Sequence, residues 1–168
     1  MNFYDIDTVK QLCDGPPTDR ENLLSKDIRR ANIDAINHAL NLLQLSYTLL
    51  LLEGKIHCDE FHRGKNSFSD LGERYGYINS FVRVDSGTNT FRFAYRRPTS
   101  SGKLFRKSIP MKNKGYTRES FRPAAHEYEI ELCLMTEEHY SLLRDTGKTI
   151  KEAMRKLRKK EMQKFYKR

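Results

Sequence analysis

The sequence predicts an α+β fold: a long N-terminal helix, a three-stranded antiparallel β-meander, and C-terminal helices with a basic tail. Three observations predict it. Apolar residues recur at helical spacing between Leu24 and Leu52, three short alternating segments follow between residues 77 and 111, and helical patterns resume after Thr117. A chain of 168 residues is long enough for one domain with an appendage and a real core.

The N-terminal helical region, residues 1–53, contains a short predicted helix over DTVKQLC and a long one after DGPP. Thr18 with Glu21 matches a capping box at the start of the long helix, and Gly54 is its expected end. An apolar stripe with a coiled-coil period runs along residues 24–52, either as the seam of a homodimer or as the face packed on the chain's own sheet. Its members are Leu24, Ile28, Ala31, Ala35, His38, Leu42, Leu45, Leu49 and Leu52.

Residues 54–76 are predicted to form a linker, and residues 77–147 a β-meander with a helix. The three strands are expected at 77–84, 90–97 and 103–111. The segments DSGTN and PTSSG between them combine glycine with small polar residues, as hairpin connections do. The last helix is expected to begin at Thr136, with a break at Gly147. Residues 148–168 form the basic C-terminal helix or tail.

Positive charge is concentrated in two segments of the chain. The formal net charge is +9, and residues 78–122 alone carry +9 because Asp85 and Glu119 are their only acids. Residues 148–168 carry +8, so the remaining residues sum to −8. This distribution favours a polyanionic partner, and the alternative is a basic protein whose cationic surface is simply solvated.

The middle predicted strand, FRFAYRRP (91–98), alternates aromatic and basic residues. We expect its aromatic face to pack on helices, so that Arg92 and Arg96 point to the opposite side. Arg83 and Arg106 join them if the strand register allows it. A small sheet can enter the major groove, where arginine makes bidentate contacts with guanine. The predicted DNA-binding residues are Arg83, Arg92, Arg96, Arg97, Lys103, Arg106, Lys107, Lys112, Lys114 and Arg118.

No sequence motif predicts catalysis, a cofactor or a bound metal. The segment HCDEFH (57–62) groups potential ligands, but the sequence has no second ligand cluster at a familiar spacing. Phosphate-binding loops, nucleophile elbows and the H-E-x-x-H motif do not occur in it. Three distant cysteines favour a reducing compartment, and the apolar run at 42–52 is too short to span a bilayer. We therefore expect a cytoplasmic protein that is not an enzyme and does not contact a membrane.

The stretch 101–145 resembles the C-terminal half of the MobI-like proteins of conjugative plasmids and integrative elements. The resemblance is carried by KNKGY (112–116), by Phe121, and by the pairs Tyr128–Glu129 and Leu143–Arg144. It implies an auxiliary mobilisation factor that acts at the origin of transfer and helps to bring the relaxase there. By their chemistry, Phe121 and Tyr128 are interpreted as packing residues, and the lysines of KNKGY as phosphate contacts. The family positions are Lys112, Lys114, Gly115, Tyr116, Phe121, Tyr128 and Glu129.

Taken together, these features predict a sequence-specific double-stranded DNA-binding accessory factor of conjugative transfer, with the origin of transfer as its target and the relaxase as a partner. Two alternatives stay open. A transcriptional regulator of a mobile element would use the same surface. A basic interaction protein would instead recruit acidic partners through its tail and its long helix.

Overall fold

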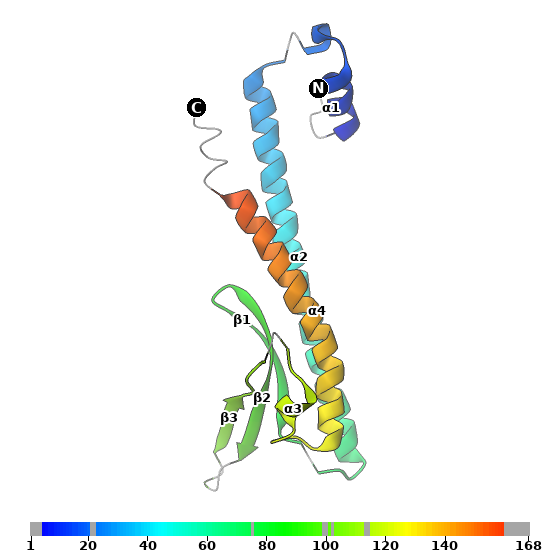
Figure 1. The fold of residues 1–168 in the computed structure, drawn as a ribbon, viewed down its shortest axis with the longest axis vertical. Helices are drawn as coiled ribbons and strands as arrows, with labels where there is room; N and C mark the ends of the chain where they lie inside the picture. Colours follow the sequence, from blue (N-terminus) through cyan, green and yellow to red (C-terminus); the bar gives the residue numbers. More distant parts are fainter. Residues whose placement is uncertain are drawn as a thin grey trace. The chain divides into compact units, whose positions relative to one another are not determined.

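The computed structural model confirms the α+β fold (Figure 1). The chain divides into two compact units, and each is described by itself. The N-terminal unit comprises residues 1–46 with 152–168, and the sheet unit comprises residues 47–151. The structure describes residues 5–20, 23–74, 76–98, 101, 103–112 and 115–159.

The N-terminal unit begins with helix α1 (Ile6–Asp14), which confirms the predicted short helix. The Asp5 carboxylate caps it by accepting hydrogen bonds from the backbone of Asp7 and Thr8. A 3-10 helix, η1 (Pro17–Arg20), follows. The predicted helix start at Thr18 is therefore wrong, because this residue lies in η1 and the long helix begins at Ser25.

Helix α2 (Ser25–Asp70) continues through the predicted linker at 54–76 up to Asp70. The expected end at Gly54 is also wrong, and the reason is packing. A Cβ atom at Gly54 would lie 2.2 Å from Cε1 of Phe91, so this glycine lets the helix approach the sheet closely. Phe61 and Lys65 are buried further along α2, which shows that the buried side of the helix extends past the expected end.

The sheet consists of β1 (Ile78–Asp85), β2 (Thr88–Pro98) and β3 (Leu104–Ser108). Its order is β1-β2-β3 with antiparallel pairs, which confirms the predicted meander. Ser86 and Gly87 form the first hairpin turn with φ values of 47° and 73°. Positive φ at both central residues is the mark of a type I′ turn, whose twist matches that of the strands.

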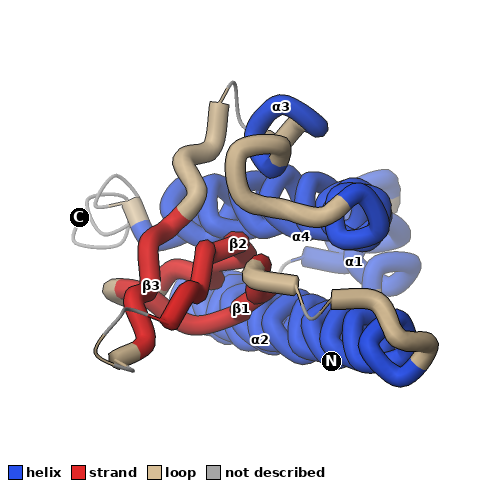
Figure 2. The backbone as a smooth tube through the Cα atoms, turned by 90° about the horizontal axis from the view of Figure 1, so that it is seen from below, coloured by secondary structure: helices blue, strands red, loops and turns tan. Residues whose placement is uncertain are grey.

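The core of the sheet unit lies between one face of the sheet and helices α2 and α4 (Figure 2). Phe93 is fully buried there, and its ring contacts Phe61 on α2, Tyr140 on α4 and Phe121 at centroid distances of 5.9, 5.6 and 5.1 Å. Phe91 also packs against Tyr140. The aromatic face of β2 is therefore the core face, as predicted.

Helices α3 (Arg118–Phe121) and α4 (Glu127–Arg158) complete the fold. The expected helix start at Thr136 and break at Gly147 are both wrong, because the two residues lie inside α4. A Cβ atom at Gly147 would lie 3.3 Å from the ring of Tyr47, so this glycine permits close packing of α4 on α2. Of the predicted basic tail, residues up to Arg158 belong to α4, and residues 160–168 lie outside the described ranges.

Among the described helices, α2 alone is long and apolar enough, by length and composition, to cross a membrane. These two criteria are weak evidence, since a mostly buried core helix of a soluble protein meets them too, but only 6% of the apolar window of α2 is buried. The apolar run at 42–52 covers about 16 Å of helix, roughly half of the ~30 Å hydrocarbon core of a bilayer.

Candidate nucleic-acid interface

The strand register places four predicted arginines on the face of the sheet opposite to the core. Arg96 pairs with Arg106 across β2 and β3, and Arg92 pairs with Phe81 across β1 and β2. Arg83 follows Phe81 by two residues and therefore points to the same side. The condition on the register is met for both Arg83 and Arg106. We call this surface the outer face; it consists of Phe81, Arg83, Arg92, Arg96 and Arg106, with Ala94 between the two arginines of β2.

The four arginines of the outer face differ in their surroundings, although all are exposed. Arg83 forms an ion pair with Asp85 at 2.8 Å, and this hydrogen bond lowers the pKa of Asp85. For Arg92 and Arg96, the described part of the chain provides no side-chain hydrogen bond or ion pair. Because residues 78–122 contain only one other acid, most of the charge on this face stays available to an external anion.

Phe81 lies on the edge strand β1, directly across from Arg92 of the outer face, and reasoning from the sequence missed it. Its ring is half-buried. The guanidinium carbon of Arg106 lies 4.4 Å from the ring centroid, and that of Arg83 lies 5.4 Å from it. These are cation–π distances. The signal was present in the sequence, because Phe81 and Arg83 share strand parity within YINSFVRV.

The predicted lysines surround the sheet instead of joining the outer face. Lys107 pairs with Tyr95 in the register, so it has the parity opposite to that of Arg106. Lys103 is exposed just before β3, and Lys112 is exposed in an isolated bridge with Gly115. The backbone of Arg97 pairs with Phe105, and Lys114 lies outside the described residues.

Arg118 has a different environment from the other predicted contacts. It begins α3 and forms ion pairs with Glu127 and Glu131 at the start of α4. The hydrogen bonds to Glu131 and Glu127 raise the pKa of its guanidinium. Two carboxylates thus compensate its charge, and its evident role is to hold α3 against α4.

The family positions outside the lysines are mostly structural in their surroundings. Phe121 is fully buried in the core. The ring of Tyr128 stacks on Phe68 at 4.8 Å, and its hydroxyl donates to the carbonyl oxygen of Arg74. Tyr116 is buried, and its hydroxyl donates to the carbonyl oxygen of Ile109. Such contacts are typical of packing residues.

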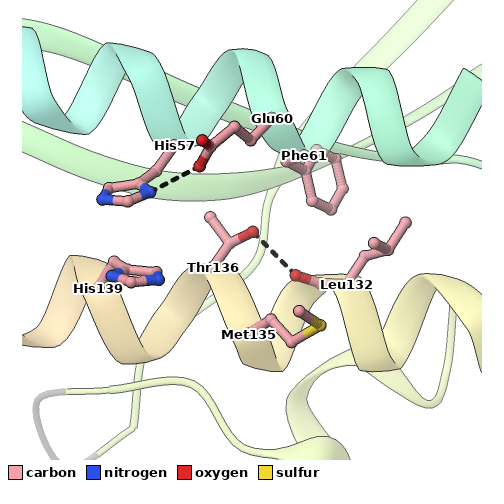
Figure 3. Close-up of a pocket in the computed structure, with 7 residues that line it drawn as sticks. All are labelled: His57, Glu60, Phe61, Leu132, Met135, Thr136 and His139. Carbon is pink, nitrogen blue, oxygen red and sulfur yellow. Dashed lines mark hydrogen bonds and ion pairs between the residues drawn. The ribbon is translucent and has the colours of Figure 1, made fainter.

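The HCDEFH segment lies on α2 beside a small open pocket of about 110 Å³ (Figure 3). The ring of His57 stacks on that of His139 from α4 at 3.9 Å, and its Nδ1 lies 2.9 Å from a Glu60 oxygen. Cys58 and His62 instead make hydrogen bonds with the carbonyl oxygen of Ser80. Within the described ranges, no three His, Cys, Asp or Glu side chains gather as a metal site requires.

Comparison of the chain with protein-family models, with curated proteins and with solved structures gives no significant match. Function is therefore inferred from the geometry and charge of the outer face.

Proposed function

We propose that the chain binds double-stranded DNA through the outer face of its sheet. The observation that carries this proposal is the gathering of four exposed arginines from three strands on one face of the sheet, two of them over the ring of Phe81. Asp85 is the one acid of the segment 78–112, and it engages Arg83. A dense, mostly unpaired group of arginines attracts phosphates and offers planar donors to base edges.

The dimensions of the sheet fit a groove of duplex DNA. Three strands about 4.8 Å apart give a width of about 10 Å between the outer two, and the major groove of B-DNA is about 12 Å wide. Small sheets and β-ribbons bind in this groove in several families of DNA-binding proteins.

Duplex DNA fits the outer face better than single-stranded nucleic acid does. Proteins that bind single strands stack unpaired bases on exposed aromatic rings. The rings of Phe91 and Phe93 are 2% and 0% exposed in the core, so they are not available for stacking. On the outer face, Arg106 lies over the ring of Phe81.

We further propose a cytoplasmic role at the origin of transfer of a mobile element, as an accessory factor that helps to recruit the relaxase. This part of the proposal is supported by the resemblance of residues 101–145 to MobI-like proteins. A transcriptional regulator of a mobile element would bind DNA through the same arginines. An interaction protein that recruits acidic partners would depend on residues 148–168 and on the long helix instead.

The proposal is tested by the double variant Arg92→Ala plus Arg96→Ala, with binding to duplex DNA measured by fluorescence anisotropy between about 50 and 200 mM salt. We expect weaker binding and a salt slope that is smaller by about 2, because each lost phosphate contact changes it by about 1. The matched control, Lys55→Ala plus Arg63→Ala, removes two exposed positive charges from α2 and should leave the slope unchanged. Equal slopes for the arginine variant and the wild type would refute the proposal.

A deletion separates the alternatives. Removing residues 159–168, which follow α4, leaves buried Met154 in place and should weaken binding to all DNA sequences about equally if this segment adds phosphate contacts. If the deletion abolishes a protein partnership and leaves DNA binding intact, the interaction-protein alternative is favoured. A footprint on the DNA that flanks the gene of this chain would identify the target.

A further inference from the structure

The Arg106 side chain is oriented differently from the other cations of the outer face. It starts from β3 opposite Arg96, yet its guanidinium lies over Phe81 on β1. It therefore crosses the middle strand diagonally. Ala94 lies on the outer side of β2 between Arg92 and Arg96, and it is 0% exposed despite that position. The small side chain of Ala94 leaves room for the crossing.

Arg106 combines a fixed orientation with a free charge. The cation–π contact with the ring of Phe81 restricts the position of its guanidinium. Within the described residues it pairs with no carboxylate, whereas Arg83, the other arginine near this ring, is engaged by Asp85. A guanidinium has five N–H donors, so a contact with one ring leaves donors available to an external acceptor.

We propose that Arg106 reads a guanine base in the major groove and that Phe81 is the positioning residue that orients it. This inference rests on the proposed DNA-binding function and adds a base preference to it. Guanine presents two acceptors, O6 and N7, which match the paired donors on the edge of a guanidinium. Among the described residues, no ring lies under the guanidinium of Arg92 or Arg96, and we assign these two arginines to phosphate contacts.

The test uses Arg106→Lys in the full chain, with a library of duplexes randomised at each position of the footprinted site. Lysine keeps the charge but lacks the planar pair of donors. We expect the wild type to prefer guanine at one position and the variant to lose this preference by about tenfold, within the range for one bidentate contact. The salt slope should stay the same. Arg96→Lys is the matched control and should keep the preference.

The role of Phe81 is tested by Phe81→Tyr and Phe81→Leu. Tyrosine keeps an aromatic face under Arg106, so the guanine preference should persist. Leucine keeps apolar bulk without that face, so the preference should fall toward the level of Arg106→Lys. Circular dichroism checks that both variants fold, and Arg106→Lys tests the inference even if a Phe81 variant does not, because Arg106 is exposed.

The outcomes separate this inference from the function on which it rests. If duplex binding depends on Arg92 and Arg96 but the guanine preference survives in Arg106→Lys, the inference is overturned and DNA binding stands. The same holds if the wild type shows no base preference, or if Arg106→Lys weakens all sequences equally. If the wild type does not bind duplex DNA, both are overturned.

Discussion

Lys65 on α2 and Glu129 on α4 form an ion pair inside the core of the sheet unit, with 3.7 Å between Nζ and Oε1. Both residues are 0% exposed. Together they hold the first residue of β1, because Lys65 donates to the carbonyl oxygen of Ile78 and Glu129 accepts from its backbone N–H. Glu129 also accepts from the backbone N–H of His126, at the start of α4. The pair thus ties two helices to the strand that carries Phe81 and Arg83.

Removing either charge of this pair should strongly destabilise the fold. Glu129→Gln leaves a buried ammonium without its counter-charge, and Lys65→Met leaves a buried carboxylate. Breaking a buried ion pair in this way costs about 3–5 kcal/mol in free energy of unfolding.

Urea denaturation measures this loss for each variant and for the two combined. We expect the double variant to lose less than the sum of the two single losses, since the second change removes a side chain whose contact across the pair is already lost. Additive losses would mean that the two side chains do not interact.

Gly54→Ala should destabilise the chain even though alanine is the better helix former. In an exposed helix the exchange of glycine for alanine stabilises by about 0.8–1.0 kcal/mol. At Gly54 the new methyl group would collide with the buried ring of Phe91, and overpacking of this kind costs about 1–3 kcal/mol. Gly64→Ala is the matched control on the same helix, because its Cβ would meet only the half-buried side chain of Leu132, at 3.0 Å. Thermal unfolding measures the difference. The Tm of Gly54→Ala should fall, whereas the Tm of Gly64→Ala should rise or should fall by a clearly smaller amount.

The contrast between Gly54 and the hairpin turn shows which parts of the fold were predictable. Ser86 and Gly87 follow from local chemistry, since two positive φ values are needed between two alternating strands. The alternation of FRFAYRRP likewise settles the directions of its side chains, because a strand has a period of two. Gly54 is different, because a glycine that ends a helix and one that admits a neighbouring ring look the same in sequence. Only the contact with Phe91 separates the two.

In the candidate site, too, the features set within one strand were predictable, and those that depend on several elements were not. Arg92 and Arg96 lie on one strand, so their common face follows from local spacing. The contact between Arg106 and Phe81 depends on the register of three strands and on the small side chain of Ala94, which a single strand does not encode. The ion pairs of Arg118 connect α3 to residues further along the chain, so its compensation by Glu127 and Glu131 could not be read from local charge.

The free energy of unfolding should fall as the pH rises above about 9. Burial raises the pKa of the Cys58 and Cys133 thiols above 9.0, and it also raises the pKa of the Tyr116 and Tyr140 hydroxyls above 10.0. The unfolded chain releases these protons at the ordinary pKa values, while the folded chain keeps them. The free energy of unfolding therefore decreases as the pH rises. Below pH 9 these thiols and hydroxyls are protonated in both states, so their full contribution to the free energy of unfolding is present. Lys65 acts in the opposite direction, because burial lowers its pKa.

This pH dependence is measured by urea denaturation at a series of pH values. In Cys58→Ala plus Cys133→Ala, the decline should begin about one pH unit higher, where the tyrosines of the unfolded chain start to ionise. Cys13→Ala should behave as the wild type, since Cys13 is exposed. If the free energy of unfolding of this double cysteine variant begins to decline at the same pH as that of the wild type, the two cysteines do not contribute to the pH dependence.

The heptad stripe of α2 is expected to join two copies of the chain. Gly54 and Phe61 face the core, whereas Leu49 and Leu52 are 52% and 56% exposed, so the stripe is not the surface that packs on the sheet. An exposed 3.5-residue apolar period is typical of a coiled-coil seam, so a second copy is the natural partner. We expect sedimentation equilibrium to give a concentration-dependent dimer for the wild type and a monomer for Leu52→Asp. The free energy of unfolding of the monomer should change by no more than about 0.5 kcal/mol, because the side chain is exposed.

Leu71→Asp makes the same exchange at a residue that is 81% exposed outside the stripe, and it should dimerise as the wild type does. A wild-type chain that stays monomeric at every concentration would rule out the seam, whereas a dimer would predict a pseudo-palindromic DNA target.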